Sequence, residues 1–378
     1  MTPRQELIKY LLEFGYSNEQ ITTILTNKEV KKSKEQTILE HAIEINNYLL
    51  TEKYTKEEII NQVLDFPKLY TYTKNNLEQK NKDLLEIGYS KQDIKKITKR
   101  FSKLYSYSKD NIAKTISDLE QLLDLTNKQV LKMTTIYPTI IGYSTDTLKN
   151  KIDDLIKFGY KEEDVKKIIK RVPFVIQYSK ERLNDKIIAF NKLGYSKEAF
   201  IKMTKSLPNL FEYSLEDNIK PKIEELIKLG YTKEQVLNMT IIFPSIFSHS
   251  INTITQRIED IISLGYTKEQ ALNITYQLPA LFGYSFDKIK DKITYLREIN
   301  LENIVTENTK QLIQSTELIY ARYEYLKNEH SKIITMDDYT RLFVRNKQFE
   351  TQYNITKQAL LEKYDYNKYM EEKNARTI

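Results

Sequence analysis

The sequence predicts an all-α protein, a right- or left-handed superhelical solenoid of helical repeats of about 35 residues with proline-broken short helices. Glycine and proline are rare among the 378 residues, with eight of each. Most of them recur every 35 or 36 residues, and proline follows glycine by 14 residues wherever a repeat has both. A fixed period of this length indicates one supersecondary unit copied in tandem. The recurring positions are Gly15, Gly88, Gly159, Gly194, Gly230 and Gly265, and Pro67, Pro138, Pro173, Pro208, Pro244 and Pro279.

The first helix of each repeat is predicted from the residues that follow the glycine. A tyrosine comes next, then Ser or Thr, and most copies have an acid or amide three residues after the hydroxyl, as in Ser90 and Asp93. This is the pattern of a helix N-cap with a capping box. The tyrosine is spaced to pack against an apolar residue four positions after the cap, as Tyr195 is with Phe200, which is a hydrophobic staple. The glycine itself is suited to ending the preceding helix in a left-handed conformation.

The proline ends this first helix, because it lacks an N–H donor and restricts the residue before it. A short apolar step follows, and a second Tyr-Ser pair then caps a second helix. In that helix, apolar residues 4, 8 and 11 positions after the Ser form one face, for example Leu148, Ile152 and Leu155 after Ser144. Alternating strand patterns are absent from the sequence, so each repeat is expected to be a pair of helices.

The repeats vary toward the two ends of the chain, and this suggests three regions. Residues 1–50 are expected to form an N-terminal cap with one degenerate repeat, and residues 299–378 a degenerate repeat with a C-terminal helical cap. Between them, residues 51–298 hold about seven repeats, and terminal repeats of a solenoid need a polar outer face. Two internal copies deviate, since Ser102 replaces the proline and Asp124 replaces the glycine.

Composition excludes several classes of function. Lys and Arg total 59 against 52 Asp and Glu, a net charge of +7. Without cysteine there is no disulfide, thiolate metal site or thiol nucleophile, and the three histidines, His41, His249 and His330, are far apart in sequence. The sequence has no phosphate-binding loop and no nucleophile with a partner at useful spacing, so we expect no enzyme, no catalytic residues, no cofactor and no metal.

The predicted setting follows from what the chain lacks. No stretch approaches the roughly 20 apolar residues of a membrane span, and the N-terminus has no signal core or Arg- and Ser-rich leader. We therefore expect a soluble, intracellular and monomeric protein without membrane contact, either cytoplasmic or organellar with a leader removed.

The order of motifs resembles the mitochondrial transcription termination factor (mTERF) family. The run Leu-Gly-Tyr-Ser-Lys-Glu, then Pro-x-Leu-Phe, Tyr-Ser and Ile-x-x-Lys-Ile is plainest in residues 193–231 and 229–266, with weaker copies from about 50 to 300. The resemblance implies a superhelix with a positively charged concave groove for double-stranded nucleic acid, acting in organellar transcription, replication or RNA maturation. Pentatricopeptide repeats have a similar period and read single-stranded RNA, but they lack a proline at this position.

One position of the second helix is nearly always basic, and we call it the basic column. It lies seven residues after the Ser or Thr cap, about 60 to 70° from the centre of the apolar face. A long side chain there can lay its stem on the core and place its charge at the rim, where it could contact a phosphate. The alternative is a solvated lysine in a lysine-rich protein. The column consists of Lys80, Thr115, Lys151, Lys186, Lys222 (one residue later, after an insertion at Pro221), Arg257 and Lys292.

Further basic residues precede the proline in two repeats, Lys99-Arg100 and Lys170-Arg171. Together with the basic column and the resemblance, they predict non-catalytic binding of double-stranded nucleic acid, DNA in preference to RNA, and a role in regulating transcription. Phosphate contacts supply affinity without sequence preference. The alternative is a helical-repeat scaffold for protein–protein interaction.

Overall fold

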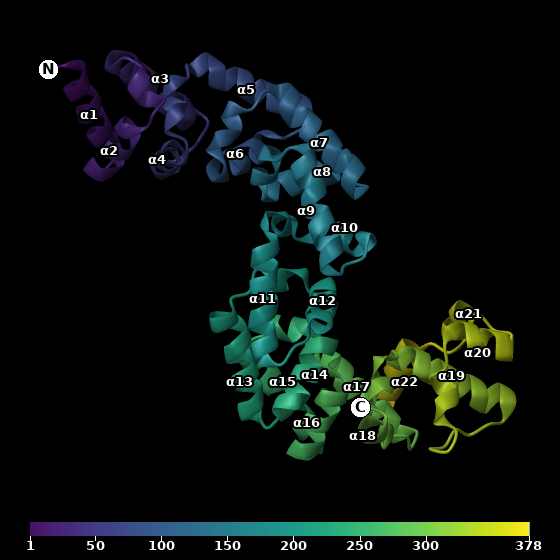
Figure 1. Ribbon diagram of the computed structural model, residues 1–378. Helices are drawn as coiled ribbons and strands as arrows, with labels where there is room; N and C mark the ends of the chain where they lie inside the picture. Colours follow the sequence, from purple (N-terminus) through teal and green to yellow (C-terminus); the bar gives the residue numbers. More distant parts are fainter. Residues whose placement is uncertain (378) are drawn as a thin grey trace. The chain divides into compact units, whose positions relative to one another are not determined.

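The computed structural model describes residues 1–377, which contain helices and no β-strand (Figure 1). The predicted all-α class and the helical repeat are therefore confirmed. The chain divides into two compact units, Met1–Lys186 and Ile187–Ile378. The three regions predicted from the sequence, with boundaries at residues 50 and 298, stay a prediction, and residue 378 lies outside the described residues.

Each repeat has an even-numbered first helix, a short 3₁₀ helix (η) and an odd-numbered second helix. The first unit begins with an N-terminal segment of α1 (Pro3–Phe14), α2 (Asn18–Thr26), η1 (Val30–Lys32) and α3 (Glu35–Thr51). Its repeats then comprise α4 (Lys56–Asp65), η2 (Pro67–Thr71), α5 (Lys74–Ile87), α6 (Lys91–Arg100), η3 (Ser102–Ser106), α7 (Lys109–Leu123), α8 (Asn127–Ile136), η4 (Pro138–Gly142), α9 (Thr145–Phe158), α10 (Glu162–Arg171) and η5 (Pro173–Gln177).

The boundary between the units falls inside α11 (Lys180–Leu193). The second unit continues the pattern and ends in a helical segment without the repeat. Its elements are α12 (Lys197–Ser206), η6 (Pro208–Phe211), η7 (Leu215–Ile219), α13 (Lys220–Leu229), α14 (Lys233–Ile242), η8 (Pro244–Ser248), α15 (Ile251–Ser263), α16 (Lys268–Gln277), η9 (Pro279–Gly283), α17 (Phe286–Glu298), α18 (Ile304–Glu307), η10 (Thr309–Ile313), α19 (Thr316–His330), η11 (Tyr339–Leu342), α20 (Asn346–Tyr353), α21 (Lys357–Lys363) and α22 (Tyr366–Thr377).

The helix caps and helix-ending residues predicted for the repeats are present in the structure. All six recurring glycines have positive φ angles, between 99° and 125°, and Asp124 takes a left-handed conformation with φ of 51°. Capping boxes close the first turn of α4, α6, α8, α14 and α16. The step after the proline is a 3₁₀ helix with proline in its first turn. Ser102 starts the same element, and its N–H donates to Asp65 Oδ2 at 3.0 Å.

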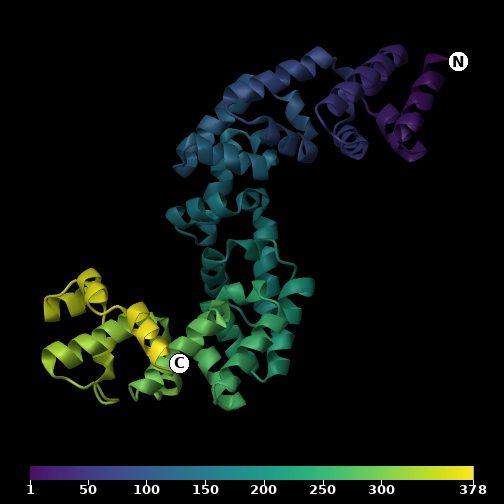
Figure 2. The same ribbon diagram turned by 180° about the vertical axis from the view of Figure 1, so that it is seen from behind.

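Even- and odd-numbered helices form two layers. Within the first unit, α3, α5 and α7 pack in sequence, and so do α4, α6 and α8. Figures 1 and 2 show α4, α6 and α8 on the inner side of the curve that α3 to α8 follow. In the second unit α12, α14 and α16 pack in the same manner. Equivalent residues of these packed helices therefore form columns along each layer, whereas α10 (Glu162–Arg171) packs against α7 and α9.

A buried tyrosine joins the even-numbered helices of successive repeats. In several repeats the tyrosine before the cap hydrogen-bonds a threonine of the next even-numbered helix, as Tyr195 does with Thr240 at 2.7 Å between hydroxyl oxygens. Tyr266, before the cap of α16, instead donates to Glu302 Oε1, and Leu125 stands at this position before α8. Both side chains are almost fully buried, and the threonine also donates to a carbonyl of its own helix. The sequence predicts only the hydrophobic staple for these tyrosines, and the bond between repeats is an additional role. The same bond recurs at 2.9 Å in Tyr54–Thr98, 2.6 Å in Tyr89–Thr134 and 2.5 Å in Tyr231–Thr275.

The C-terminal segment folds back on the last repeats of the second unit. Helix α22 packs against α19, and the hydroxyl of Tyr366 donates to Asp291 Oδ1 of α17 at 2.6 Å. Tyr295, Tyr320 and Tyr369 surround this contact with ring centroids 4.8 to 6.4 Å apart. The segment thus contacts α17 and α19, the two second helices that precede it.

Candidate nucleic-acid interface

The basic column lies on the odd-numbered helices, two turns after each N-cap. The structure directs several of its side chains at backbone oxygens of the following repeat. Lys80 Nζ donates to the carbonyl of Tyr107 at 2.8 Å, and Lys151 Nζ donates to that of Tyr178 at 3.0 Å. Each acceptor is the residue directly after a 3₁₀ helix, where carbonyls lack a partner within the helix. The cation therefore satisfies a helix C-terminus of its neighbour, where positive charge is favourable.

The same contact occurs in the second unit. Arg257 donates to the carbonyl of Tyr284 and forms an ion pair with Asp260 at 2.6 Å. Lys292 is only 8% exposed and donates to the carbonyl of Leu312. Burial lowers the pKa of Lys292 to about 8. These cations are consequently held inside the joints between repeats.

Three members of the column differ from this pattern. Lys222 follows the inserted Pro221 and the π-helical turn η7, and its Nζ pairs with Glu225 of its own helix at 2.9 Å. Lys186 Nζ lies 5.9 Å from the centre of the Tyr178 ring. Thr115 donates to the carbonyl of Asn111 in the preceding turn.

The column extends beyond the repeats that the sequence analysis recognised. His41 lies seven residues after the N-cap of α3, and its Nδ1 is 3.2 Å from the carbonyl oxygen of Tyr70. Arg322 lies seven residues after the cap of α19 and is 1% exposed. Its guanidinium donates to the carbonyls of Leu342 and Val344 at 2.7 and 2.8 Å, and burial lowers its pKa to about 10. Both residues could have been assigned to the basic column from the sequence, because each lies seven residues after a helix cap.

The basic residues before the proline lie at the C-terminal ends of α6 and α10. Arg100 is exposed and uses one N–H to cap α8, donating to the Ile136 carbonyl at 3.3 Å. The adjacent Lys99 forms an ion pair with Glu58 of α4. Lys170 and Arg171 are exposed and make no hydrogen bond or ion pair with any residue that the structure describes. Of the predicted site residues, these two and Arg100 have the most donors available to a ligand.

A second column, which the sequence analysis missed, lies on the even-numbered helices. We call it the exposed column: it is six residues after each first-helix cap, and every member is exposed. None of its side chains hydrogen-bonds or pairs with a charge within residues 1–377. This column could have been recognised in the sequence as a position on the polar face of the first helix where no repeat has an acidic residue. The exposed column consists of Asn61, Lys96, Lys132, Lys167, Lys202, Asn238 and Asn273.

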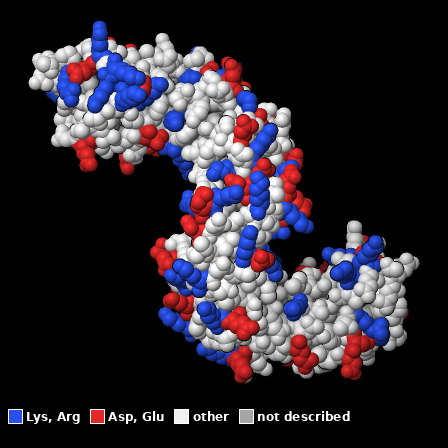
Figure 3. All heavy atoms as spheres, in the orientation of Figure 1, with Lys and Arg blue, Asp and Glu red and all other residues white. Residues whose placement is uncertain are grey.

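Charge is unevenly distributed along the even-numbered helices of the first unit. Helix α10 has Glu162, Glu163 and Asp164 in its first turn and Lys170 and Arg171 in its last. Helix α6 likewise has an acid, Asp93, in its first turn and ends with two bases, and α8 contains no acid. The exposed column is therefore positive on α6, α8 and α10, and the ends of α6 and α10 add further bases, whereas α4 has Asn61 at this position and ends in Asp65. Figure 3 also shows Lys and Arg side chains grouped over the N-terminal helices of this unit.

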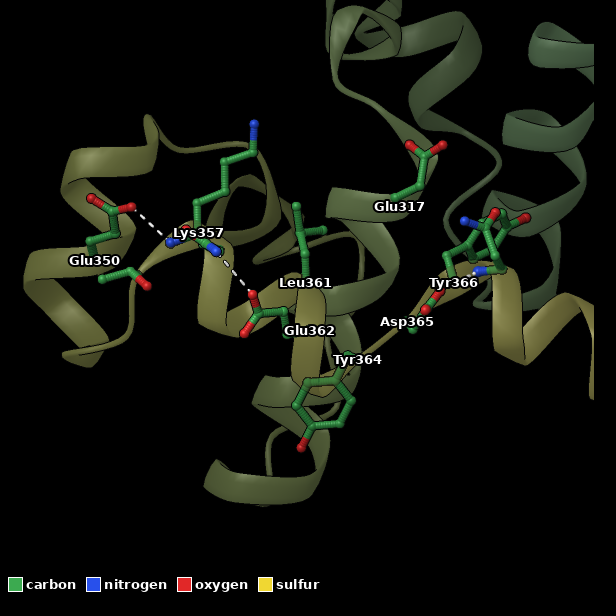
Figure 4. A pocket seen from close by; sticks show the side chains of 11 residues that line it. Glu317, Glu350, Lys357, Leu361, Glu362, Tyr364, Asp365 and Tyr366 are labelled. Atoms are coloured by element: carbon green, nitrogen blue, oxygen red, sulfur yellow. Dashed lines mark hydrogen bonds between the residues drawn. The ribbon is translucent and has the colours of Figure 1, made fainter.

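The second unit contains a pocket of a different character. It has a volume of about 820 Å³ and lies among α19, α20, α21 and the start of α22 (Figure 4). Its carboxylates include Glu350, which accepts from the Lys357 N–H at 2.8 Å, and Glu362, which accepts from Gln358 at 3.0 Å. The pocket is acidic, so it is unsuited to a phosphate, and its carboxylates are largely explained by helix contacts. The described residues contain no group of metal-ligating side chains, and no helix among them combines the length and apolar character of a membrane span.

Comparison with known families gives one match. A family model described as mTERF matches residues 2–157 and 153–262, more than half of the chain. No curated protein matches the sequence. The matched ranges include α1 to α14 and therefore most of both columns.

Proposed function

Because the chain belongs to the mTERF family of nucleic-acid-binding helical-repeat proteins, we propose that it binds double-stranded nucleic acid without catalysis. Within this proposal the ligand is DNA in preference to RNA, and the bound protein regulates transcription. Proteins of the family are generally non-catalytic, and they act in transcription or its termination.

The exposed column of the first unit carries this proposal. Lys96, Lys132 and Lys167 lie at the same register on α6, α8 and α10, and each has an exposed ammonium without a protein partner among the described residues. An unpaired lysine on a surface is free to replace a counterion of a phosphate, which is the main source of affinity for nucleic acid. Lys170 and Arg171 extend the positive surface at the end of α10.

The basic column has a different role in this proposal. Lys80, Lys151, Arg257 and Lys292 hold the next repeat in place, and so the spacing of the even-numbered helices depends on them. Lys80 and Lys151 are partly exposed and have three N–H donors each, so contact with a phosphate is compatible with their carbonyl bonds. Phosphate contacts of the basic column, Lys186 and Lys222 included, remain a prediction, and we expect them to add less than the exposed column does.

Fluorescence anisotropy with labelled duplex DNA, duplex RNA and single strands tests the proposal across a salt series. We expect duplex binding that weakens as salt rises. A triple variant, Lys96→Gln, Lys132→Gln and Lys167→Gln, removes up to three phosphate contacts, so the slope of log K against log salt should become shallower by about 2.7.

The matched control removes the same charge from the odd-numbered layer. Lys82, Lys149 and Lys157 are exposed on α5 and α9, and their replacement by Gln changes the net charge equally. We expect this control to keep most of the slope. An equal effect in both variants would show that net charge alone matters, and absence of duplex binding at low salt would favour the protein scaffold.

A further inference from the structure

The exposed column changes its chemistry along the second unit. Lys202 of α12 is followed at the same register by Asn238 of α14 and Asn273 of α16. The three helices pack side by side, and all three side chains are exposed. The position therefore passes from a cation to a neutral amide on neighbouring helices of one layer.

These asparagines have no role within the protein that the structure shows. Asn238 and Asn273 form no hydrogen bond with any described residue. By contrast, Gln235 and Gln270 of the same two helices close capping boxes, and their Oε1 atoms accept from the backbone N–H of Thr232 and Thr267 at 2.8 and 2.9 Å. Asparagine is also a poorer helix former than lysine or alanine, so the middle of a short helix does not favour it.

A side-chain amide is suited to reading bases. It offers one acceptor and two donors, and it can bind both N6 and N7 of adenine in the major groove. Ile242, four residues after Asn238, lies on the same face of α14 and is 62% exposed. An apolar group there can contact the methyl group of thymine, which partners adenine.

We propose that Asn238 and Asn273, with Ile242, read base edges and give the chain a preference for A·T pairs in the major groove of a duplex. This inference rests on the proposed function and deepens it. The lysines of the first unit supply affinity that does not depend on sequence, and the amides of the second unit supply the preference. A neutral amide contact also leaves the salt dependence unchanged, so the two contributions can be measured separately.

The test uses the full chain and two duplexes. One is selected by the wild-type chain from a pool of randomised duplex DNA, and the other is the same sequence with its A·T pairs replaced by G·C. We expect the wild type to bind the selected duplex more tightly. In the double variant Asn238→Ala, Asn273→Ala this preference should fall by roughly 5- to 150-fold for each adenine that is no longer recognised. Its affinity for the G·C duplex and its salt slope should stay as in the wild type.

The control replaces two exposed asparagines of the odd-numbered layer, Asn191→Ala and Asn252→Ala, and should keep the preference. Alanine favours helix, so the variants are expected to fold, and circular dichroism checks this. A wild type that binds both duplexes equally, or a double variant that keeps the preference, overturns the inference while duplex binding stands. Absence of all duplex binding by the wild type overturns the proposed function instead.

Discussion

Replacing Lys151 with methionine tests whether the basic column joins the repeats. Lys151 Nζ donates to the carbonyl of Tyr178 at 3.0 Å, and Tyr178 is only 4% exposed. Methionine keeps much of the apolar stem but has no donor, so the carbonyl at the end of η5 is left without its charged partner. A hydrogen bond from a charged group contributes about 1.5 to 3 kcal/mol, and we expect the free energy of unfolding to fall by this amount.

Urea denaturation followed by circular dichroism gives the global destabilisation, and hydrogen exchange gives its location. Since a solenoid is stabilised by contacts between neighbouring repeats, amides of η5 and the start of α11 should exchange faster than those of distant repeats. Lys149→Met, an exposed lysine of the same helix, should change stability by less than about 0.5 kcal/mol. Equal stability of the two variants would refute the role of Lys151 in joining the repeats. Weaker duplex binding by Lys151→Met at unchanged stability would assign Lys151 to phosphate contact instead.

Two further predictions concern other buried groups of the joints. Tyr195→Phe removes the bond to Thr240 but leaves the threonine bonded to its own helix, so urea denaturation should show a destabilisation of about 1 kcal/mol. Burial lowers the folded-state pKa of Lys292 to about 8, from its ordinary value of 10.5, so its protonated form is disfavoured in the folded chain. Between pH 8 and 10 the unfolded state therefore binds more protons, and this residue makes stability rise with pH. In Lys292→Met that contribution should vanish, and a urea midpoint with the same pH slope in both proteins would contradict it.

The sequence predicts the fold well because the residues that start and end each helix act locally. A capping box, a left-handed glycine and a proline each act within a few residues of the chain, so their effect can be read without knowing the neighbours. Asp124 shows the limit: it replaces glycine yet keeps the left-handed conformation, which Asn and Asp tolerate better than other side chains. The π-helical turn at Leu215–Ile219 was visible only as an insertion before Pro221.

The candidate site was harder to predict, because its assignment depends on which neighbour a side chain meets. Lys80 and Lys96 are both lysines on amphipathic helices. One donates to the carbonyl of a residue 27 positions later, and the other has no partner among the described residues. The spacing that identified the basic column could not show that the carbonyl of Tyr107 lies beside it. The role of Tyr195 was similarly ambiguous from the sequence, because the hydrophobic staple and the hydrogen bond to Thr240 both require a buried tyrosine ring.

Whether a column keeps the same type of residue in successive repeats helps to distinguish a structural role from a ligand-binding role in this chain. Several joints between repeats present a backbone carbonyl at or near the end of the 3₁₀ helix, so a residue that closes such a joint must be a donor. Most members of the basic column behave in this way, from His41 to Arg322, and the exceptions are Thr115, Lys186 and Lys222. A position that contacts the ligand need not have the same residue type in every repeat, because some repeats contact phosphates and others contact bases. The exposed column, which changes from Lys202 to Asn238 without change of exposure, has the variation that a ligand-facing position should have.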